Sequence, residues 1–108
     1  MYTRWSPLLF PKVVLTDGAL AFAEEHGAYW LMDAIASYQP QLLKDSMLRE
    51  IQFWELLVGE QTHLMCRKDS GYAPSVTQTF DSTSVKHTQK FFVGRQDDFM
   101  VIMLPEEY

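Results

Sequence analysis

Cysteine is nearly absent from this sequence: Cys66 is the only one in 108 residues. A disulfide within the chain is therefore excluded, and the composition suits a reducing compartment. Basic residues are also few. Nine Lys and Arg stand against fourteen Asp and Glu, for a net charge of -5, and Arg67-Lys68 is the only adjacent basic pair. Nucleic acids and anionic membranes attract clustered cations, so we expect neither as a direct partner.

Long apolar runs are missing as well. No stretch approaches the roughly 18 uncharged apolar residues that a membrane-spanning helix needs. Pro7 and Pro11 interrupt the first apolar segment before it reaches the length of a signal peptide. We therefore expect a soluble, cytoplasmic protein.

Apolar residues are plentiful in spite of this. The chain is 47% hydrophobic and 14% aromatic, which is enough to bury a core in a single domain covering residues 1–108. Pro7 and Pro11 each lack a backbone donor, so we predict an irregular N-terminal arm over residues 1–12. Its expected buried anchors are Trp5, Leu8, Leu9 and Phe10.

Helical spacing of apolar residues begins after this arm. Thr16 or Asp17 can cap a helix that starts near Asp17 and reaches His26-Gly27, a favoured C-terminal pair. A second helical pattern covers residues 28–38 and is expected to stop at Gln39-Pro40, with a further helical turn within residues 41–49. Gly27 either separates two helices or kinks one longer helix, and the sequence leaves both alternatives open.

From residue 51 onward the pattern changes to short runs separated by turn residues. Even spacing of this kind is typical of an antiparallel meander. We therefore predict an α+β fold in which N-terminal helices pack on a four- to five-stranded antiparallel meander sheet. The expected strands cover residues 51–58, 62–68, 76–80, 88–95 and 99–104.

Residues 16–18, 26–35, 53–54 and 104–108 together resemble a group of small bacterial proteins of unknown function, which are sometimes found in phage or mobile-element settings. The resemblance covers most of the chain and matches poorly from Asp81 to Lys90. It implies a compact bacterial domain and assigns no catalytic residues.

The sequence supplies few groups for catalysis or metal binding. Cys66 lies three residues after His63, an odd spacing that sends the two side chains to opposite faces of a strand. His87 could approach Cys66 from a neighbouring strand, but a buried thiol explains Cys66 better. The three histidines stand far apart, and Asp17 is better explained as a helix-start residue. We therefore predict no catalytic, cofactor-binding or metal-binding residues.

Two of the predicted strands are apolar on both faces. In residues 51–58 one face carries Phe53 and the other Trp54, and residues 99–104 show the same pattern. An antiparallel sheet with helices on one side normally has a polar second face. We therefore expect the N-terminal arm and a second protein chain to cover that face.

These features favour a non-catalytic protein-interaction module that binds another protein or a copy of itself. Its concrete version is an anti-CRISPR-like inhibitor of a host defence complex, in which carboxylates compete with phosphates for a basic surface. The alternatives are a small-ligand-binding domain or a small enzyme with an aromatic-lined pocket. The expected interaction residues are Tyr29, Trp30, Trp54, Asp97, Asp98, Glu106 and Glu107.

Overall fold

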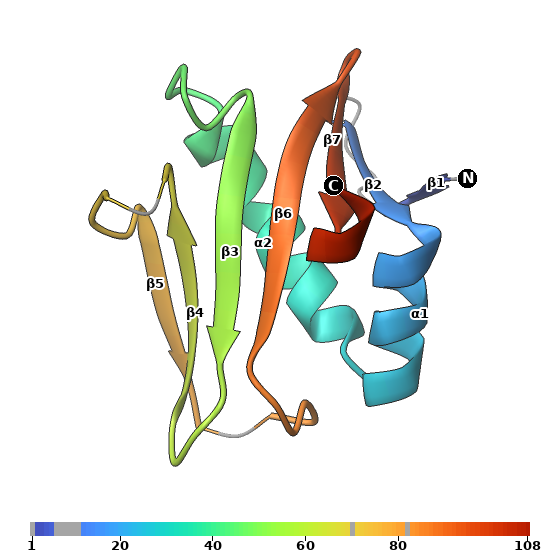
Figure 1. The fold of residues 1–108 in the computed structure, drawn as a ribbon, viewed down its shortest axis with the longest axis vertical. Coiled ribbons are helices and arrows are strands. Elements are labelled where there is room, and N and C mark those ends of the chain that lie inside the picture. Colours follow the sequence, from blue (N-terminus) through green and yellow to red (C-terminus); the bar gives the residue numbers. More distant parts are fainter. Residues whose placement is uncertain (1, 6–11, 70, 82) are drawn as a thin grey trace.

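A computed structural model describes residues 2–5, 12–69, 71–81 and 83–108, which form one twisted sheet with two α-helices (Figure 1). The predicted α+β class is therefore confirmed. The elements in chain order are β1 (Tyr2–Arg4), β2 (Lys12–Thr16), α1 (Asp17–His26), α2 (Tyr29–Leu42), β3 (Ile51–Leu57), β4 (Thr62–Arg67), β5 (Val76–Phe80), β6 (Gln89–Gln96), β7 (Phe99–Met103) and the short 3₁₀ helix η1 (Pro105–Glu107).

The sheet differs from the predicted one. Seven strands lie in the order β1-β2-β7-β6-β3-β4-β5, so β6 lies beside β3 and not beside β5, where a meander would place it. β2 pairs with β7 in parallel, whereas the other strand pairs within the described residues are antiparallel. The prediction of N-terminal helices on a four- to five-stranded antiparallel meander is therefore wrong, because two strands precede the helices and the sheet is mixed.

The N-terminal segment explains the missed strands. Tyr2–Arg4 forms an edge strand along β2, and Lys12–Thr16 forms a nearly fully buried strand between β1 and β7. The irregular arm predicted over residues 1–12 covers β1, whereas β2 lies almost wholly after that arm. The pairing partner of β2 lies more than eighty residues away in the chain. Leu8, Leu9 and Phe10 lie outside the described residues.

Two helices follow, separated by Gly27. The Thr16 hydroxyl accepts a hydrogen bond from the Ala19 N–H at 3.1 Å and so caps α1. Gly27 ends that helix in the left-handed conformation, with a φ of 58°. The second helix was predicted to stop at Gln39-Pro40. It instead continues through Pro40 to Leu42. In the last turn of a helix, a proline removes only one backbone donor, so the helix survives there.

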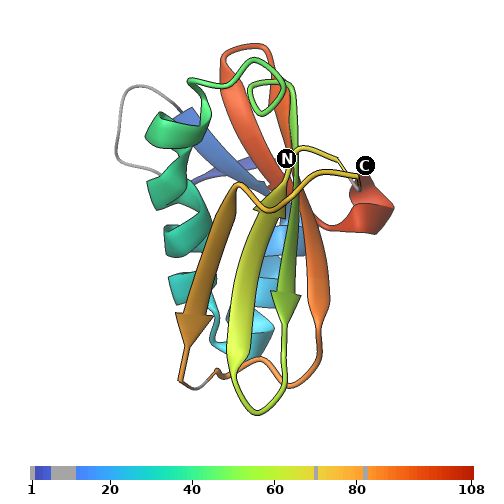
Figure 2. The same ribbon diagram turned by 90° about the vertical axis from the view of Figure 1, so that its left-hand side faces the viewer.

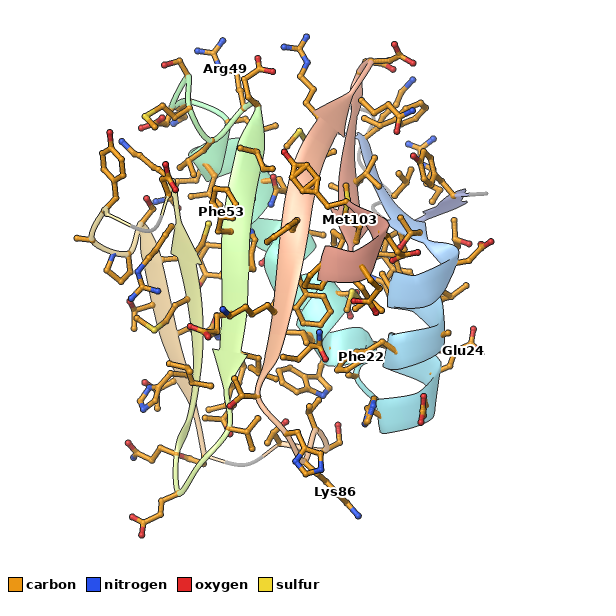
Figure 3. All side chains as sticks on the ribbon, viewed as in Figure 1. Phe22, Glu24, Arg49, Phe53, Lys86 and Met103 are labelled. Carbon is orange, nitrogen blue, oxygen red and sulfur yellow. The ribbon has the colours of Figure 1, made fainter. Side chains whose placement is uncertain are left out.

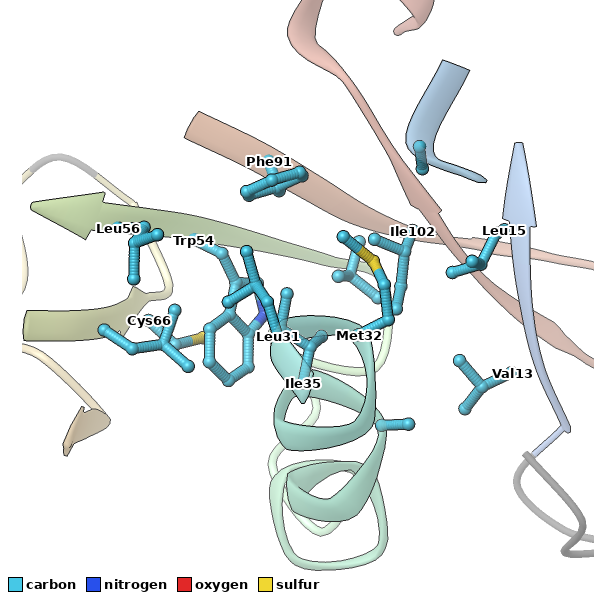
Figure 4. Close-up of a cluster of buried hydrophobic side chains, with 14 of the residues drawn as sticks. Val13, Leu15, Leu31, Met32, Ile35, Trp54, Leu56, Cys66, Phe91 and Ile102 are labelled. Carbon is cyan, nitrogen blue, oxygen red and sulfur yellow. The ribbon is translucent and has the colours of Figure 1, made fainter. Parts of the chain in front are cut away.

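The helices cover one face of the sheet, which we call the inner face (Figure 2). Side chains from α2 meet large side chains from β3, β6 and β7 in a continuous apolar core (Figure 4). Burial of these side chains supplies the main driving force for folding. The largest fully buried apolar side chains are Trp54, Phe91, Leu15, Leu31, Met32, Ile35, Leu56, Leu64, Ile102 and Val13.

Two glutamines lie inside this core. Gln39 of α2 and Gln52 of β3 are fully buried and exchange two amide hydrogen bonds, of 2.9 and 2.7 Å. Each amide nitrogen donates its second proton to a helix or loop carbonyl, and Gln52 Oε1 also accepts from Trp54 Nε1 at 2.8 Å. Every donor of the pair is therefore satisfied, and the pair fixes the end of α2 against the middle of the sheet.

Candidate functional site

The second face of the sheet, which we call the outer face, is covered over only half of its width. Val14 and Val101 point to this face and are still buried. Tyr2 on β1 donates a hydrogen bond from its hydroxyl to Gln96 on β6. This contact joins the edge strand β1 to β6, although β2 and β7 lie between them in the sheet.

The C-terminal segment covers the rest of this half. The Glu107 carboxylate accepts hydrogen bonds from the Thr16 hydroxyl at 2.6 Å, the Gly18 N–H at 3.2 Å and the Leu104 N–H at 3.0 Å. These contacts hold η1 against the start of α1. They place the Tyr108 ring edge-on against Phe92, with centroids 5.0 Å apart.

The other half of the outer face, over β6, β3 and β4, has no helix in front of it (Figures 1 and 3). Its centre is aromatic. Phe53 on β3 lies directly opposite Phe92 on β6, and the two rings pack edge to face at 5.3 Å. Both side chains are half-buried, as are Met65 and Met103 on the same face. We call Phe53, Glu55, Met65, Arg67, Lys90, Phe92 and Met103 the open outer face.

Charged residues of both signs surround this aromatic pair. Arg67 on β4 lies opposite Phe53 on β3, and Lys90 on β6 lies opposite Glu55 on β3. Together with Asp69 and the two phenylalanines they line a hollow of about 460 Å³. A second hollow of about 400 Å³ adjoins it and is lined by residues including Met47, Ile51 and Phe53. Ring faces surrounded by charge can bind either a protein surface or a small planar molecule.

The helical aromatic residues predicted for the site lie elsewhere. Tyr29 is 44% exposed and stacks on Trp5 at 5.4 Å, and Trp5 Nε1 donates to Asp33 at 2.8 Å. Trp30 packs on Phe80. Trp5 therefore contacts α2. The prediction that it helps to cover the outer face is wrong.

Trp54 is 1% exposed and points to the inner face, where it packs near Tyr38. Its side chain is not accessible to a partner, and we do not include it in the open outer face. Its neighbour Phe53 occupies the outer side of the same strand.

The predicted acidic residues are also dispersed. Asp97, with a φ of 55°, occupies the turn between β6 and β7. Lys12 lies 3.2 Å from Asp98, and this contact lowers the pKa of the Asp98 carboxyl. Glu106 is exposed on η1, whereas Glu107 serves the internal contacts described above. None of the four lines the hollow between Phe53 and Phe92.

The residues considered for catalysis do not converge. Cys66 is fully buried on the inner face and His63 lies on the outer face, so the predicted separation of the two is confirmed. Burial raises the pKa of the Cys66 thiol to about 12, which leaves it protonated and unreactive near neutral pH. Within the described ranges, no group of three His, Cys, Asp or Glu side chains could hold a metal ion.

Sequence reasoning missed Phe92, Glu55, Arg67 and Lys90. Alternation along residues 51–58 had placed Phe53 on one face, but the sequence contains no sign that Phe92 lies beside it. That neighbourhood depends on β6 entering the sheet between β7 and β3.

The fold and the site define a small α+β protein whose mixed sheet is covered by helices on one face and half open on the other. The chain belongs to a family of unknown function, DUF6876, whose model matches residues 1–108. No curated protein and no solved structure shows a significant match. Among the residues that the structure describes, no helix is both long enough and apolar enough to cross a membrane.

Proposed function

We propose that this protein is a non-catalytic protein-interaction module and that the open outer face is its contact surface. The observation that carries the proposal is the Phe53–Phe92 pair, which is only partly buried although it lies in the middle of a sheet. Aromatic side chains surrounded by charged residues are typical of the centre of protein interfaces. Two aromatic rings at the centre of a sheet face without a layer over it are unusual, because the uncovered face of an antiparallel sheet is normally polar.

The charges of this surface bear on the kind of partner. Glu55 and Asp69 balance Arg67 and Lys90, so the surface has no strong excess of either sign. A balanced surface suits a partner that also carries both signs. The narrower hypothesis, an anti-CRISPR-like inhibitor in a bacterial mobile element, needs carboxylates aimed at a basic channel. Glu107 and Asp98 are instead held by Thr16 and Lys12, so this version has less support than the general one.

A second candidate function is binding of a small planar ligand in the same hollow. Its volume of about 460 Å³ is within the range of ligand pockets, and two phenyl rings form part of its wall. A metabolite that raises the melting temperature of the wild type but not of Phe92→Ala would favour this candidate.

Photo-crosslinking from single positions tests the main proposal. The protein would carry benzoyl-phenylalanine at position 92, on the open outer face, or at position 24, on the exposed side of α1. Each form is irradiated in a lysate of cells that express the natural protein, and crosslinked products are identified by mass spectrometry.

We expect one defined protein adduct from position 92 and none from position 24. The adduct can contain a second copy of this chain or another protein, and either result supports a contact surface at Phe92. Equal labelling of many proteins from both positions, or no adduct from position 92, would contradict the proposal.

A further inference from the structure

The charges on the open outer face are arranged so that the surface is complementary to a second copy of itself. Phe53 lies at the centre, with Glu55 two residues along β3 and Arg67 directly across on β4. Lys90 lies opposite Glu55 on β6, and Asp69 lines the same hollow. Glu55 and Arg67, which carry opposite charges, therefore occupy mirror positions about a diagonal line through Phe53.

We propose that the partner is a second copy of this chain, packed face to face with its strands crossing at about 90°, an inference that rests on the proposed function. Orthogonal packing is one of the two common arrangements of stacked sheets. A two-fold axis in the interface, passing over Phe53 at about 45° to the strands, generates this arrangement. Symmetric dimers with such self-complementary interfaces are the commonest protein oligomers.

Strand geometry shows what this axis brings together. Neighbouring strands lie about 4.8 Å apart, and same-face residues along a strand lie about 6.8 Å apart. On that lattice the axis carries Glu55 to within about 3 Å of the position of Arg67. Each carboxylate then faces a cation of the other copy. Phe92 is carried near the position of Ile51, so apolar side chains also meet across the interface.

Other open features lie beside this contact. Tyr108 is 72% exposed, and its ring packs edge-on against Phe92 at 5.0 Å. The second hollow of about 400 Å³ is lined by residues including Met47, Glu50 and Ile51. A symmetric pair of copies has both an exposed ring and an open hollow available to it.

Charge reversal provides the test, because it separates a symmetric dimer from every other use of this surface. In Glu55→Arg, each new arginine would face Arg67 of the other copy, and in Arg67→Glu each new glutamate would face Glu55. Each variant alone should dimerise about 10- to 100-fold more weakly than the wild type. An equimolar mixture should form a heterodimer, in which both contacts again join opposite charges. Sedimentation equilibrium measures the dissociation constants of the wild type, the two variants and their mixture, and circular dichroism establishes that both variants are folded.

The mixing result decides between the outcomes. Restored dimer in the mixture supports the proposal, because only a contact between positions 55 and 67 of different copies predicts it. A monomeric wild type at all concentrations, or a mixture no more associated than either variant, would overturn the dimer. If the dimer is overturned but position 92 still crosslinks to a different protein, the proposed contact surface stands. If the dimer and the crosslink are both absent, the proposed function is wrong as well.

Discussion

The Glu107 carboxylate occupies the space that a β-carbon on residue 18 would need. An ideal β-carbon built on Gly18 would lie 2.6 Å from Glu107 Oε1, well inside contact distance. The same carboxylate accepts hydrogen bonds from Thr16 and from the Gly18 N–H. The glycine at the start of α1 therefore makes room for the C-terminal segment, and residues 16–18 and 104–108 form one structural unit.

This relationship predicts that the effect of Gly18→Ala on the free energy of unfolding depends on Glu107. Gly18→Ala should lower the free energy of unfolding by about 1–2 kcal/mol, because the methyl group displaces a charged hydrogen-bond acceptor. In a Glu107→Ala background the same change should be neutral or stabilising, because alanine is the better helix former. Urea denaturation of the four proteins measures both effects. Equal destabilisation by Gly18→Ala in both backgrounds would show that Glu107 is not what residue 18 accommodates.

The buried glutamine pair predicts strong coupling. Gln52→Leu should destabilise the protein by about 1–3 kcal/mol and more than Gln39→Leu does, because it leaves both Gln39 Oε1 and Trp54 Nε1 without a partner. The double variant should cost clearly less than the sum of the two single variants. Additive losses in a double-mutant cycle would mean that the two amides do not depend on each other.

Adjacent residues of β6 provide a matched comparison of the two sheet faces. Phe91→Ala should lower the free energy of unfolding by about 3–5 kcal/mol, because Phe91 is fully buried against α1 and the core. Phe92→Ala should cost about 1 kcal/mol or less, because its ring is half-exposed. Thermal denaturation of both variants at low protein concentration checks this. Comparable losses would mean that the outer face is covered within the single chain.

The buried thiol predicts a loss of stability at alkaline pH. Burial holds the pKa of Cys66 at about 12 in the folded protein, above its ordinary value of 9.0. The unfolded chain therefore loses this proton first, and the free energy of unfolding should fall by up to about 1.4 kcal/mol per pH unit above pH 9. Below pH 9 the thiol is protonated in both states and has no effect.

Other groups titrate in the same pH range, so the wild type is compared with Cys66→Ala, which lacks only the thiol. The difference in unfolding free energy between the two proteins should shrink steadily from pH 9 to pH 11. A constant difference would show that the thiolate is tolerated in the fold. Thiol reagents at pH 8 should likewise modify Cys66 only in denaturant.

Local patterns predicted much of the fold. The cap at Thr16, the glycine at position 27 and the strand alternation around Trp54 are signals carried by neighbouring residues, and each is where the pattern places it. The sheet order was not predictable in this way. The parallel pairing of Val14 with Val101 and the place of β6 beside β3 join distant segments, and no short pattern encodes them.

The candidate site failed to emerge from the sequence for the same reason. Phe53 and Phe92 become neighbours only through the β3–β6 pairing. Residue type alone also misled. Tryptophan is common at interfaces, but Trp54 packs inward beside Gln52. The apolar second face, in contrast, followed directly from alternation along the strands.

Methionine oxidation tests the central claim, that the open outer face is a contact surface, most directly. Met65 and Met103 lie on that face, half-exposed, and oxidation by peroxide depends on access to the sulfur. Rates at both residues would be measured by mass spectrometry for the wild type and for Phe92→Asp, in dilute solution, in concentrated solution and in lysate. We predict that both methionines are protected several-fold in concentrated wild type or in lysate, and that protection is lost in Phe92→Asp. Equal rates in the two proteins under all three conditions would contradict the account.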